Sequence, residues 1–282
     1  MNIQELLQKA RINTGPEGDH LGSELLLAFV LDKNREYLLA HGDEDVSAPM
    51  LDNFEKLFSR MIAGEPVAYL INKKEFYGLD FFVDRRVLIP RPETEHLVEK
   101  ILEFSTQTPS ALKILDVGTG SGCIAVSLAR NIASAQVAGV DISDEALEVA
   151  RLNADRHGLT SRMRFFSSNL LTAVDEPFDI VVANLPYIGE KRFSFVSKSA
   201  YDYEPHVALF GGDDGLGLYV KFFEQLSQKS WRPRLLLGEF GFLQRDELVA
   251  LFQKFFPDDK IRFEQDYAHI DRMFVVEWPP TV

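Results

Sequence analysis

The sequence predicts an α/β fold with a parallel, doubly wound sheet, preceded by a small helical domain. Three observations carry this prediction. Apolar residues recur at helical spacing within residues 1–64, strand and helix patterns alternate from residue 113 onward, and a glycine-rich loop directly follows a buried strand. With 282 residues, of which 46% are hydrophobic, the chain is long enough for one large and one smaller domain.

The N-terminal segment is expected to form helices. Between Leu51 and Ile62 the apolar residues stand three or four positions apart, so they share one face of a helix. Ser47 is a candidate N-cap for this helix, Pro49 falls near its first turn, and Gly64 follows its end. Similar patterns predict two further helices, at 3–12 and 25–31.

A β-hairpin is expected to connect the helical domain to the rest of the chain. Residues 67–71 and 76–83 are rich in β-branched and aromatic side chains, and they flank a polar turn, Asn72-Lys73-Lys74. We therefore assign residues 65–92 to a hairpin linker and residues 93–282 to the sheet domain.

Strand and helix patterns alternate within the sheet domain, which is the arrangement of a parallel sheet covered by helices. Helices are expected at 93–104, 123–132 and 145–157, and strands at 113–117, 136–142, 163–166, 178–183 and 234–239. The last two expected strands, 262–265 and 273–278, are separated by a short polar segment. This spacing predicts an antiparallel hairpin at the sheet edge.

The composition argues against several classes of partner. The 43 acidic residues outnumber the 30 basic ones, so the net charge of −13 disfavours binding to nucleic acid or to anionic membranes. Cys123 is the single cysteine, and no Cys/His cluster has the spacing of metal ligands, so we expect neither a disulfide nor a metal. The chain begins without a signal-peptide pattern and has no long apolar run. These features predict a cytoplasmic protein.

A glycine-rich loop is the first candidate site. Gly118, Gly120 and Gly122 follow a buried strand and open a helix, so the backbone there can approach a ligand closely. Asp116 at the strand end would repel a pyrophosphate but attract an amine, and Asp141 at the end of the next strand can accept bonds from ribose hydroxyls. S-adenosylmethionine meets both demands better than NAD does. We therefore assign cofactor binding to these residues and to the loop residues Thr119 and Ser121.

The second candidate site is the tetrapeptide Asn184-Leu185-Pro186-Tyr187, which follows the strand 178–183. Ligands of doubly wound folds bind at the carboxyl ends of the strands. The Asn184 side-chain carbonyl and the Leu185 main-chain carbonyl can each accept a bond from a planar NH₂ group, while Tyr187 packs on that group. The pattern predicts methylation of such a nitrogen without a catalytic histidine. It leaves open whether the acceptor is an adenine or cytosine amino group or a glutamine amide, and alone it is also compatible with a plain turn.

Longer segments of the sequence favour one of these acceptors. Residues 64–70, 75–79 and 87–95 before the cofactor loop, and 203–209 and 211–216 after the tetrapeptide, together resemble the HemK/PrmC family, the peptide chain release factor glutamine methyltransferases. The resemblance covers nearly the whole chain and is least specific in the helical domain.

This resemblance implies a seven-stranded class I (Rossmann-like) methyltransferase domain. It also implies S-adenosylmethionine as the donor, S-adenosylhomocysteine as the product, and the glutamine of the release factor Gly-Gly-Gln motif as the acceptor. By motif, residues 118–122, Asp141 and Asn184 are expected to contact the cofactor, and residues 184–187 the glutamine. The helical domain is then expected to recognise the release factor.

The chain departs from the family pattern at two positions. The family usually reads Asn-Pro-Pro-Tyr, and Leu185 makes this tetrapeptide similar to that of ribosomal RNA adenine dimethyltransferases. Asn169 stands where an acidic residue commonly faces the adenine, and its amide can still bond the adenine amino group. Arg91 and Glu93 have two interpretations, as residues lining the active site or as a loop salt bridge and a helix-start carboxylate.

Release factor glutamine methylation is therefore the predicted function. The alternative enzyme is a nucleic-acid adenine amino-group methyltransferase, favoured by Leu185 and opposed by the acidic net charge. A noncatalytic binding module is disfavoured because both candidate sites are intact.

Overall fold

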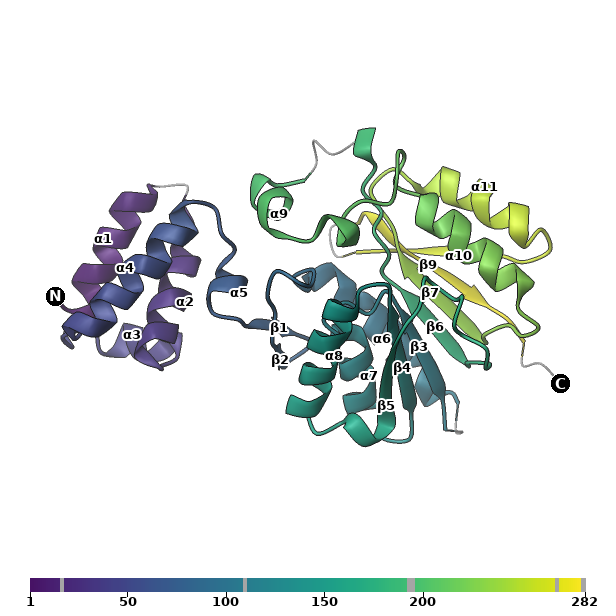
Figure 1. The fold of residues 1–282 in the computed structure, drawn as a ribbon, viewed down its shortest axis with the longest axis horizontal. Helices are drawn as coiled ribbons and strands as arrows, with labels where there is room; N and C mark the ends of the chain where they lie inside the picture. Colours follow the sequence, from purple (N-terminus) through teal and green to yellow (C-terminus); the bar gives the residue numbers. More distant parts are fainter. Residues whose placement is uncertain (16–17, 109–110, 192–195, 267–268, 280–282) are drawn as a thin grey trace. The chain divides into compact units, whose positions relative to one another are not determined.

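The computed structural model describes residues 1–15, 18–108, 111–191, 196–266 and 269–279. The chain folds into two compact units (Figure 1). The first, the N-terminal unit, consists of Met1–Lys73 together with Ser197–Tyr203. The second, the sheet unit, consists of Lys74–Val196 and Glu204–Val282.

The N-terminal unit is helical. An Asn2–Glu5 capping box begins its first helix, because each of these residues bonds the backbone N–H of the other. Its core contains Leu6, Leu26 and Phe54, all nearly inaccessible to solvent. The three expected helices are confirmed, and a short one that was not expected lies between two of them. The helices are α1 (Ile3–Thr14), α2 (His20–Leu31), α3 (Arg35–Ala40), α4 (Ala48–Ile62), α5 (Val67–Leu70) and α9 (Lys198–Tyr203).

The expected strand at 67–71 is wrong, because this segment forms the short helix α5 with Pro66 at its N-cap. A short apolar run fits a buried helix as well as a strand, and packing of Leu70 in the helical core decides between them. The hairpin exists, but it joins β1 (Lys74–Phe76) to β2 (Leu79–Phe81). Its turn is Tyr77-Gly78, with φ of 51° and 70°, as in a two-residue turn of type I′. The expected strand 76–83 and the expected turn at 72–74 are therefore also wrong.

The sheet unit contains a seven-stranded sheet in the order β5-β4-β3-β6-β7-β9-β8. The first five strands in this order are parallel, whereas β9 is antiparallel to β7 and pairs with β8 at the edge. The predicted fold class and the edge hairpin are thus confirmed. The strands are β3 (Lys113–Val117), β4 (Gln136–Asp141), β5 (Met163–Ser167), β6 (Ile180–Ala183), β7 (Leu235–Glu239), β8 (Arg262–Gln265) and β9 (Asp271–Glu277).

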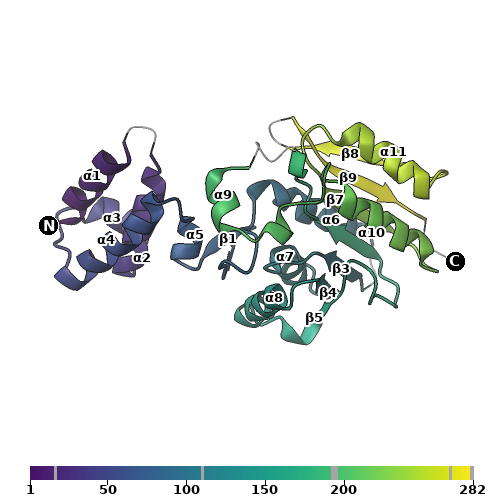
Figure 2. The same ribbon diagram turned by 45° about the horizontal axis from the view of Figure 1, so that its top comes forward.

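Helices cover both faces of this sheet (Figures 1 and 2). On one face lie α6 (Glu95–Thr106), α7 (Cys123–Asn131) and α8 (Asp144–Arg156), and on the other lie α10 (Gly217–Gln228) and α11 (Arg245–Phe255). Successive strand residues point to opposite faces, so Ile114 packs in one core and Leu115 in the other. Because β5, β4, β3, β6 and β7 are parallel, their carboxyl ends meet at one edge of the sheet, where both candidate sites lie.

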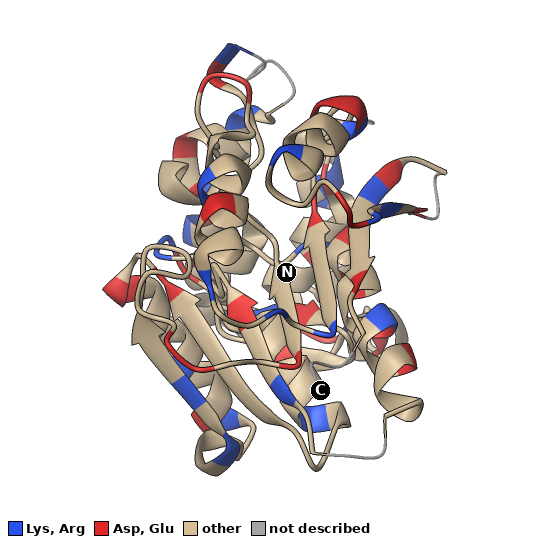
Figure 3. Cartoon of the chain, turned by 90° about the vertical axis from the view of Figure 1, so that its right-hand side faces the viewer, with Lys and Arg blue, Asp and Glu red and all other residues tan. Residues whose placement is uncertain are grey.

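Charged positions of both signs are spread over helices, strands and loops (Figure 3). Among the helices that the structure describes, none combines the length and the apolar character needed to cross a bilayer.

Candidate active site

A cavity of about 160 Å³ opens at the carboxyl ends of β3, β4 and β6. Several predicted site residues line it, from both the glycine loop and the tetrapeptide: Gly118, Gly120, Asp141, Asn169, Asn184, Leu185 and Pro186. Its other walls come from the segments 86–88, 142–146 and 205–208 and from neighbouring residues. The two sites that the sequence suggested separately thus share one cavity.

The glycine loop is fixed to the strand beside it. The backbone N–H groups of Gly118 and Thr119 both donate to the Val140 carbonyl, at 2.8 and 2.9 Å. Gly120 has φ of 53°, and a Cβ built there would meet no atom within 4 Å. The backbone at Gly120 is therefore open on the side where a side chain would otherwise stand, so a ligand can approach it closely.

Asp116 is fully buried beneath this loop. Its Oδ2 accepts a bond from Thr119 Oγ1 at 2.7 Å, whereas its Oδ1 has no hydrogen-bond partner among the described residues. Burial raises the pKa of the Asp116 carboxyl to about 7. Ser121 is also buried. Asp116, Thr119, Ser121 and Gly122 thus support the loop, and the cavity wall is formed by Gly118 and Gly120.

Asp141 connects the loop to the next turn. Its Oδ2 accepts from the Gly120 N–H at 2.9 Å, and its Oδ1 accepts from the Ser143 N–H at 3.0 Å. Burial raises the pKa of this carboxyl above its usual value. Because Asp141 also lines the cavity, one side chain both holds the loop and forms part of the cavity wall. Asn169 lines the same cavity just beyond the end of β5.

Asn184 lies directly after β6, whose last residue, Ala183, pairs with Val117 of β3 and Gly238 of β7. The pairing places Asn184 between the glycine loop and Glu239. The Asn184 amide nitrogen donates to Thr94 Oγ1 at 3.0 Å and to Glu239 Oε2 at 3.1 Å. Since a carboxamide holds its oxygen apart from its nitrogen, the carbonyl oxygen points away from these two partners.

Tyr187 and Leu185 of the tetrapeptide make different contacts. Tyr187 donates its hydroxyl to Glu239 Oε1 at 2.9 Å, and the negative charge of Glu239 together with burial raises the pKa of Tyr187 well above 10. Leu185 is 2% exposed, and its Cδ2 lies 3.2 Å from the place where a Gly118 Cβ would stand. Leu185, the departure from the family pattern, thus packs the tetrapeptide against the glycine loop.

Thr94 and Glu239 are site residues that the sequence interpretation missed. Thr94 closes the short 3₁₀ helix Pro92–Thr94 and donates its hydroxyl to Glu239 Oε2 at 2.7 Å, although the two residues are 145 positions apart. Glu239 is buried, and this burial raises the pKa of its carboxyl above the usual value. An acid at the end of the expected strand 234–239 was a usable signal for Glu239. Thr94 lies within residues 87–95, which carry part of the family resemblance, but this segment does not show that Thr94 contacts the tetrapeptide.

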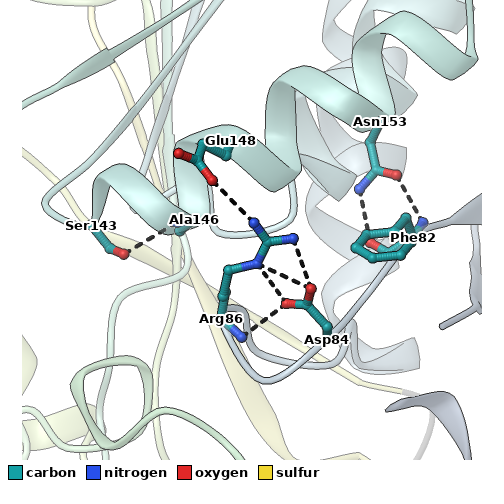
Figure 4. A network of polar contacts seen from close by, with 7 residues as sticks. All are labelled: Phe82, Asp84, Arg86, Ser143, Ala146, Glu148 and Asn153. Atoms are coloured by element: carbon teal, nitrogen blue, oxygen red, sulfur yellow. Dashed lines mark hydrogen bonds and ion pairs between the residues drawn. The ribbon is translucent and has the colours of Figure 1, made fainter. Parts of the chain in front are cut away.

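Polar contacts hold the cavity wall formed by residues 86–88 (Figure 4). Arg86 pairs with Asp84 at 2.7 Å and with Glu148 of α8 at 3.1 Å. Asn153, also on α8, exchanges two bonds with the Phe82 backbone and donates a third to the Ser121 carbonyl. A single buried amide therefore ties the glycine loop to the segment that leads into this wall.

A second set of polar contacts joins residues 89–91 to Glu204, which directly precedes the wall at 205–208. Arg91 donates to Glu204 Oε1 at 2.6 Å, and the Ile89 N–H donates to Glu204 Oε2 at 3.1 Å. Arg91 thus forms a loop salt bridge, and neither it nor Glu93 is among the residues that line the cavity. Between the two interpretations of this pair, the geometry favours the structural one.

Two family models match the chain. A model described as a PrmC N-terminal domain matches residues 3–71, and one described as a methyltransferase domain matches residues 109–204. Solved structures share the fold at low identity. The hMettl16 catalytic domain aligns over 73% of this chain and 78% of its own, with a TM-score of 0.57 and 15% identity. A methyltransferase from Pyrococcus furiosus aligns over 78% and 96%, with a TM-score of 0.51 and 17% identity.

Several relatives are much more similar in sequence to this chain than these solved structures are. A release factor glutamine methyltransferase from Koribacter versatilis is 42% identical over 83% of each chain. One from Bacillus anthracis is 35% identical over 98% of this chain and 99% of its own. One from Chlorobaculum tepidum is 41% identical over 89% and 88%. With a seven-stranded methyltransferase sheet and a tetrapeptide at its carboxyl edge, this chain belongs to the release factor glutamine methyltransferase family.

Proposed function

We propose that this protein transfers a methyl group from S-adenosylmethionine to the side-chain amide nitrogen of the glutamine in the Gly-Gly-Gln motif of peptide chain release factors. The single observation that carries the proposal is the orientation of Asn184. Asn184 lines the cavity, and because its amide nitrogen is held by Thr94 and Glu239, its carbonyl oxygen is the atom left to accept a bond from an incoming NH₂ group. The family of the chain supports a glutamine amide as that group.

The donor side of the cavity fits S-adenosylmethionine, which when bound supplies a methyl group on a positively charged sulfur. Gly120 leaves open space over the backbone, and the Asp141 carboxylate and the Asn169 amide line the cavity as partners for ribose and adenine. Asp116 has an unbonded carboxyl oxygen behind the loop, so a nearby ammonium group would favour its ionised form. The reaction needs no metal, because the thioether is already a good leaving group.

The acceptor side orients the nucleophile. The Asn184 carbonyl and the Leu185 main-chain carbonyl accept the two N–H bonds of the glutamine amide and direct its nitrogen toward the methyl group, while Tyr187 packs on the planar amide. A carbon–nitrogen bond forms as the carbon–sulfur bond breaks. The nitrogen becomes acidic only on alkylation and then loses one proton to water, so no strong base is needed beforehand. S-adenosylhomocysteine is the other product.

Release factor recognition is assigned to the helical domain of residues 1–64, with residues 65–92 as the linker and 93–282 as the methyltransferase domain. One glutamine on a loop tip provides little binding energy, so specificity must come from contacts remote from the amide. A helical domain of its own supplies such a surface. A release factor substrate also places the enzyme in the cytoplasm.

The experiment is methyl transfer from labelled S-adenosylmethionine to four separate acceptors: intact release factor, a short Gly-Gly-Gln peptide, ribosomal RNA and DNA. We expect much faster transfer to the intact factor than to the peptide and none to the nucleic acids, given the net charge of −13. Transfer to adenine in RNA or DNA in place of the factor would overturn the proposal. Equal rates on peptide and factor would contradict recognition by the helical domain.

A further inference from the structure

We propose that Glu239 is a positioning residue for methyl transfer: its carboxylate fixes which way the Asn184 amide faces and so holds the acceptor-binding carbonyl toward the substrate. This inference rests on the proposed function, because it concerns the group that receives the glutamine amide. Glu239 ends β7, outside the motifs by which the sequence indicates the site.

The Glu239 carboxylate accepts hydrogen bonds from three side chains. Thr94 Oγ1 and Asn184 Nδ2 donate to its Oε2, at 2.7 and 3.1 Å, and the Tyr187 hydroxyl donates to its Oε1 at 2.9 Å. The side chain is enclosed, with the residue 4% exposed, so water does not compete for these bonds. Two of the three donors belong to the tetrapeptide.

An ionised carboxylate only accepts hydrogen bonds, and this property determines the orientation of Asn184. If the amide were turned over, its oxygen would face Glu239 Oε2 across about the same distance, and two acceptors would repel each other. Thr94 reinforces the choice. Its single hydroxyl proton is already donated to Glu239, so Thr94 Oγ1 can only accept from Asn184.

The sheet explains why an acid at this position reaches Asn184. Ala183 of β6 pairs with Gly238 of β7, so the residues that follow them, Asn184 just after β6 and Glu239 at the end of β7, lie side by side. The carboxylate therefore acts on the substrate through Asn184, and it does not need to touch the substrate itself.

The test is a double-mutant cycle between Glu239→Gln and Asn184→Ala. Glutamine keeps the shape of the side chain, but its amide both donates and accepts, so Asn184 becomes free to adopt either orientation. We expect Glu239→Gln to lower kcat on intact release factor by roughly tenfold while donor affinity, measured by calorimetry, stays unchanged. In the Asn184→Ala background the same substitution should have no further effect, because there is no amide left to orient.

Glu224→Gln is the matched control, since Glu224 is exposed on α10 and is not among the residues lining the cavity. It should leave kcat within twofold of the unmodified enzyme. If Glu239→Gln lowers the folded fraction, Thr94→Val and Thr94→Ser replace it: the valine should lower kcat, and the serine, which keeps the hydroxyl, should restore it.

Three results would overturn the inference: unchanged kcat for Glu239→Gln, an equal loss of kcat with and without the Asn184 amide, or equal rates for the two Thr94 variants. An unmodified enzyme that does not methylate the release factor would instead overturn the proposed function, so the two failures are distinguishable.

Discussion

The donor side and the acceptor side of the cavity are built in different ways. On the donor side, the glycine loop and Asp141 are held mainly by backbone N–H groups of the loop and of the turn after β4. On the acceptor side, Asn184 is held by side chains from a 3₁₀ helix and from β7, far away in sequence. A site built from backbone groups can therefore be recognised from the local spacing of residues. A site built from converging side chains can be recognised only once the sheet is assembled.

The two buried acids show the same contrast. Asp116 on the donor side has one carboxyl oxygen bonded to Thr119 and one without a partner among the described residues. Glu239 on the acceptor side receives bonds at both oxygens from Thr94, Asn184 and Tyr187. Burial raises the pKa of both carboxyls, and the bonds from Thr94 and Tyr187 oppose this rise at Glu239, as the bond from Thr119 does at Asp116.

The largest expected effect concerns the pH dependence of stability. Because the pKa of Asp116 is about 7 in the folded protein and near 3.8 otherwise, the unfolded chain loses this proton first. The free energy of unfolding should therefore fall as the pH rises from about 4 to about 7, by up to about 4 kcal/mol, and then level off. Asp116→Asn should make this fall smaller by the share that Asp116 contributes, as measured by urea denaturation across the pH range. If the free energy of unfolding changed equally with pH in both proteins, burial would not raise the pKa of Asp116.

Asn184→Ala tests the acceptor side. Removal of the oriented carbonyl should lower kcat on release factor by about 10²-fold or more, because positioning of the nitrogen is lost. Donor affinity should change little, since Asp141 and the glycine loop are intact. Calorimetric titration with S-adenosylmethionine checks this separation. Near-normal turnover would mean that the tetrapeptide serves only as a turn.

Asp141→Ala tests the donor side. Loss of the carboxylate removes the expected bonds to ribose and the support of the Gly120 N–H, so donor affinity should fall by about tenfold or more, or about 1.5–3 kcal/mol. The same calorimetric titration measures it, with the exposed Asp155→Ala on α8 as a control for loss of an acid. An unchanged dissociation constant would remove Asp141 from the donor site.

The smallest effect should come from Gly118→Ala, which probes the contact between the two sides. Gly118 has φ of 74°, and the new Cβ would lie 3.2 Å from Leu185 Cδ2, so we expect a loss of about 1–2 kcal/mol of stability. Adding Leu185→Ala relieves the contact but not the backbone strain. The double variant should therefore be less destabilised than the sum of the single changes predicts. Strict additivity in chemical denaturation would argue that the two sides are independent.

Features of this protein that depend on local sequence pattern could be predicted before the fold was known. The alternation of strands and helices predicted the sheet and its edge hairpin, and the spacing of Gly118, Gly120 and Asp141 indicated residues that line the cavity where we propose that the donor binds. Such features follow from the period of apolar residues and from backbone conformations that few residue types allow.

Other features depend on contacts between segments that are distant in sequence, and these contacts exist only in the folded chain. Packing in the helical core made residues 67–70 a helix, although their composition suits a strand equally well. Strand pairing brought Glu239 beside Asn184, and the 3₁₀ helix before α6 added Thr94, which precedes Asn184 by 90 positions. The orientation of the Asn184 amide results from where these acceptors stand, and only the folded sheet brings them together.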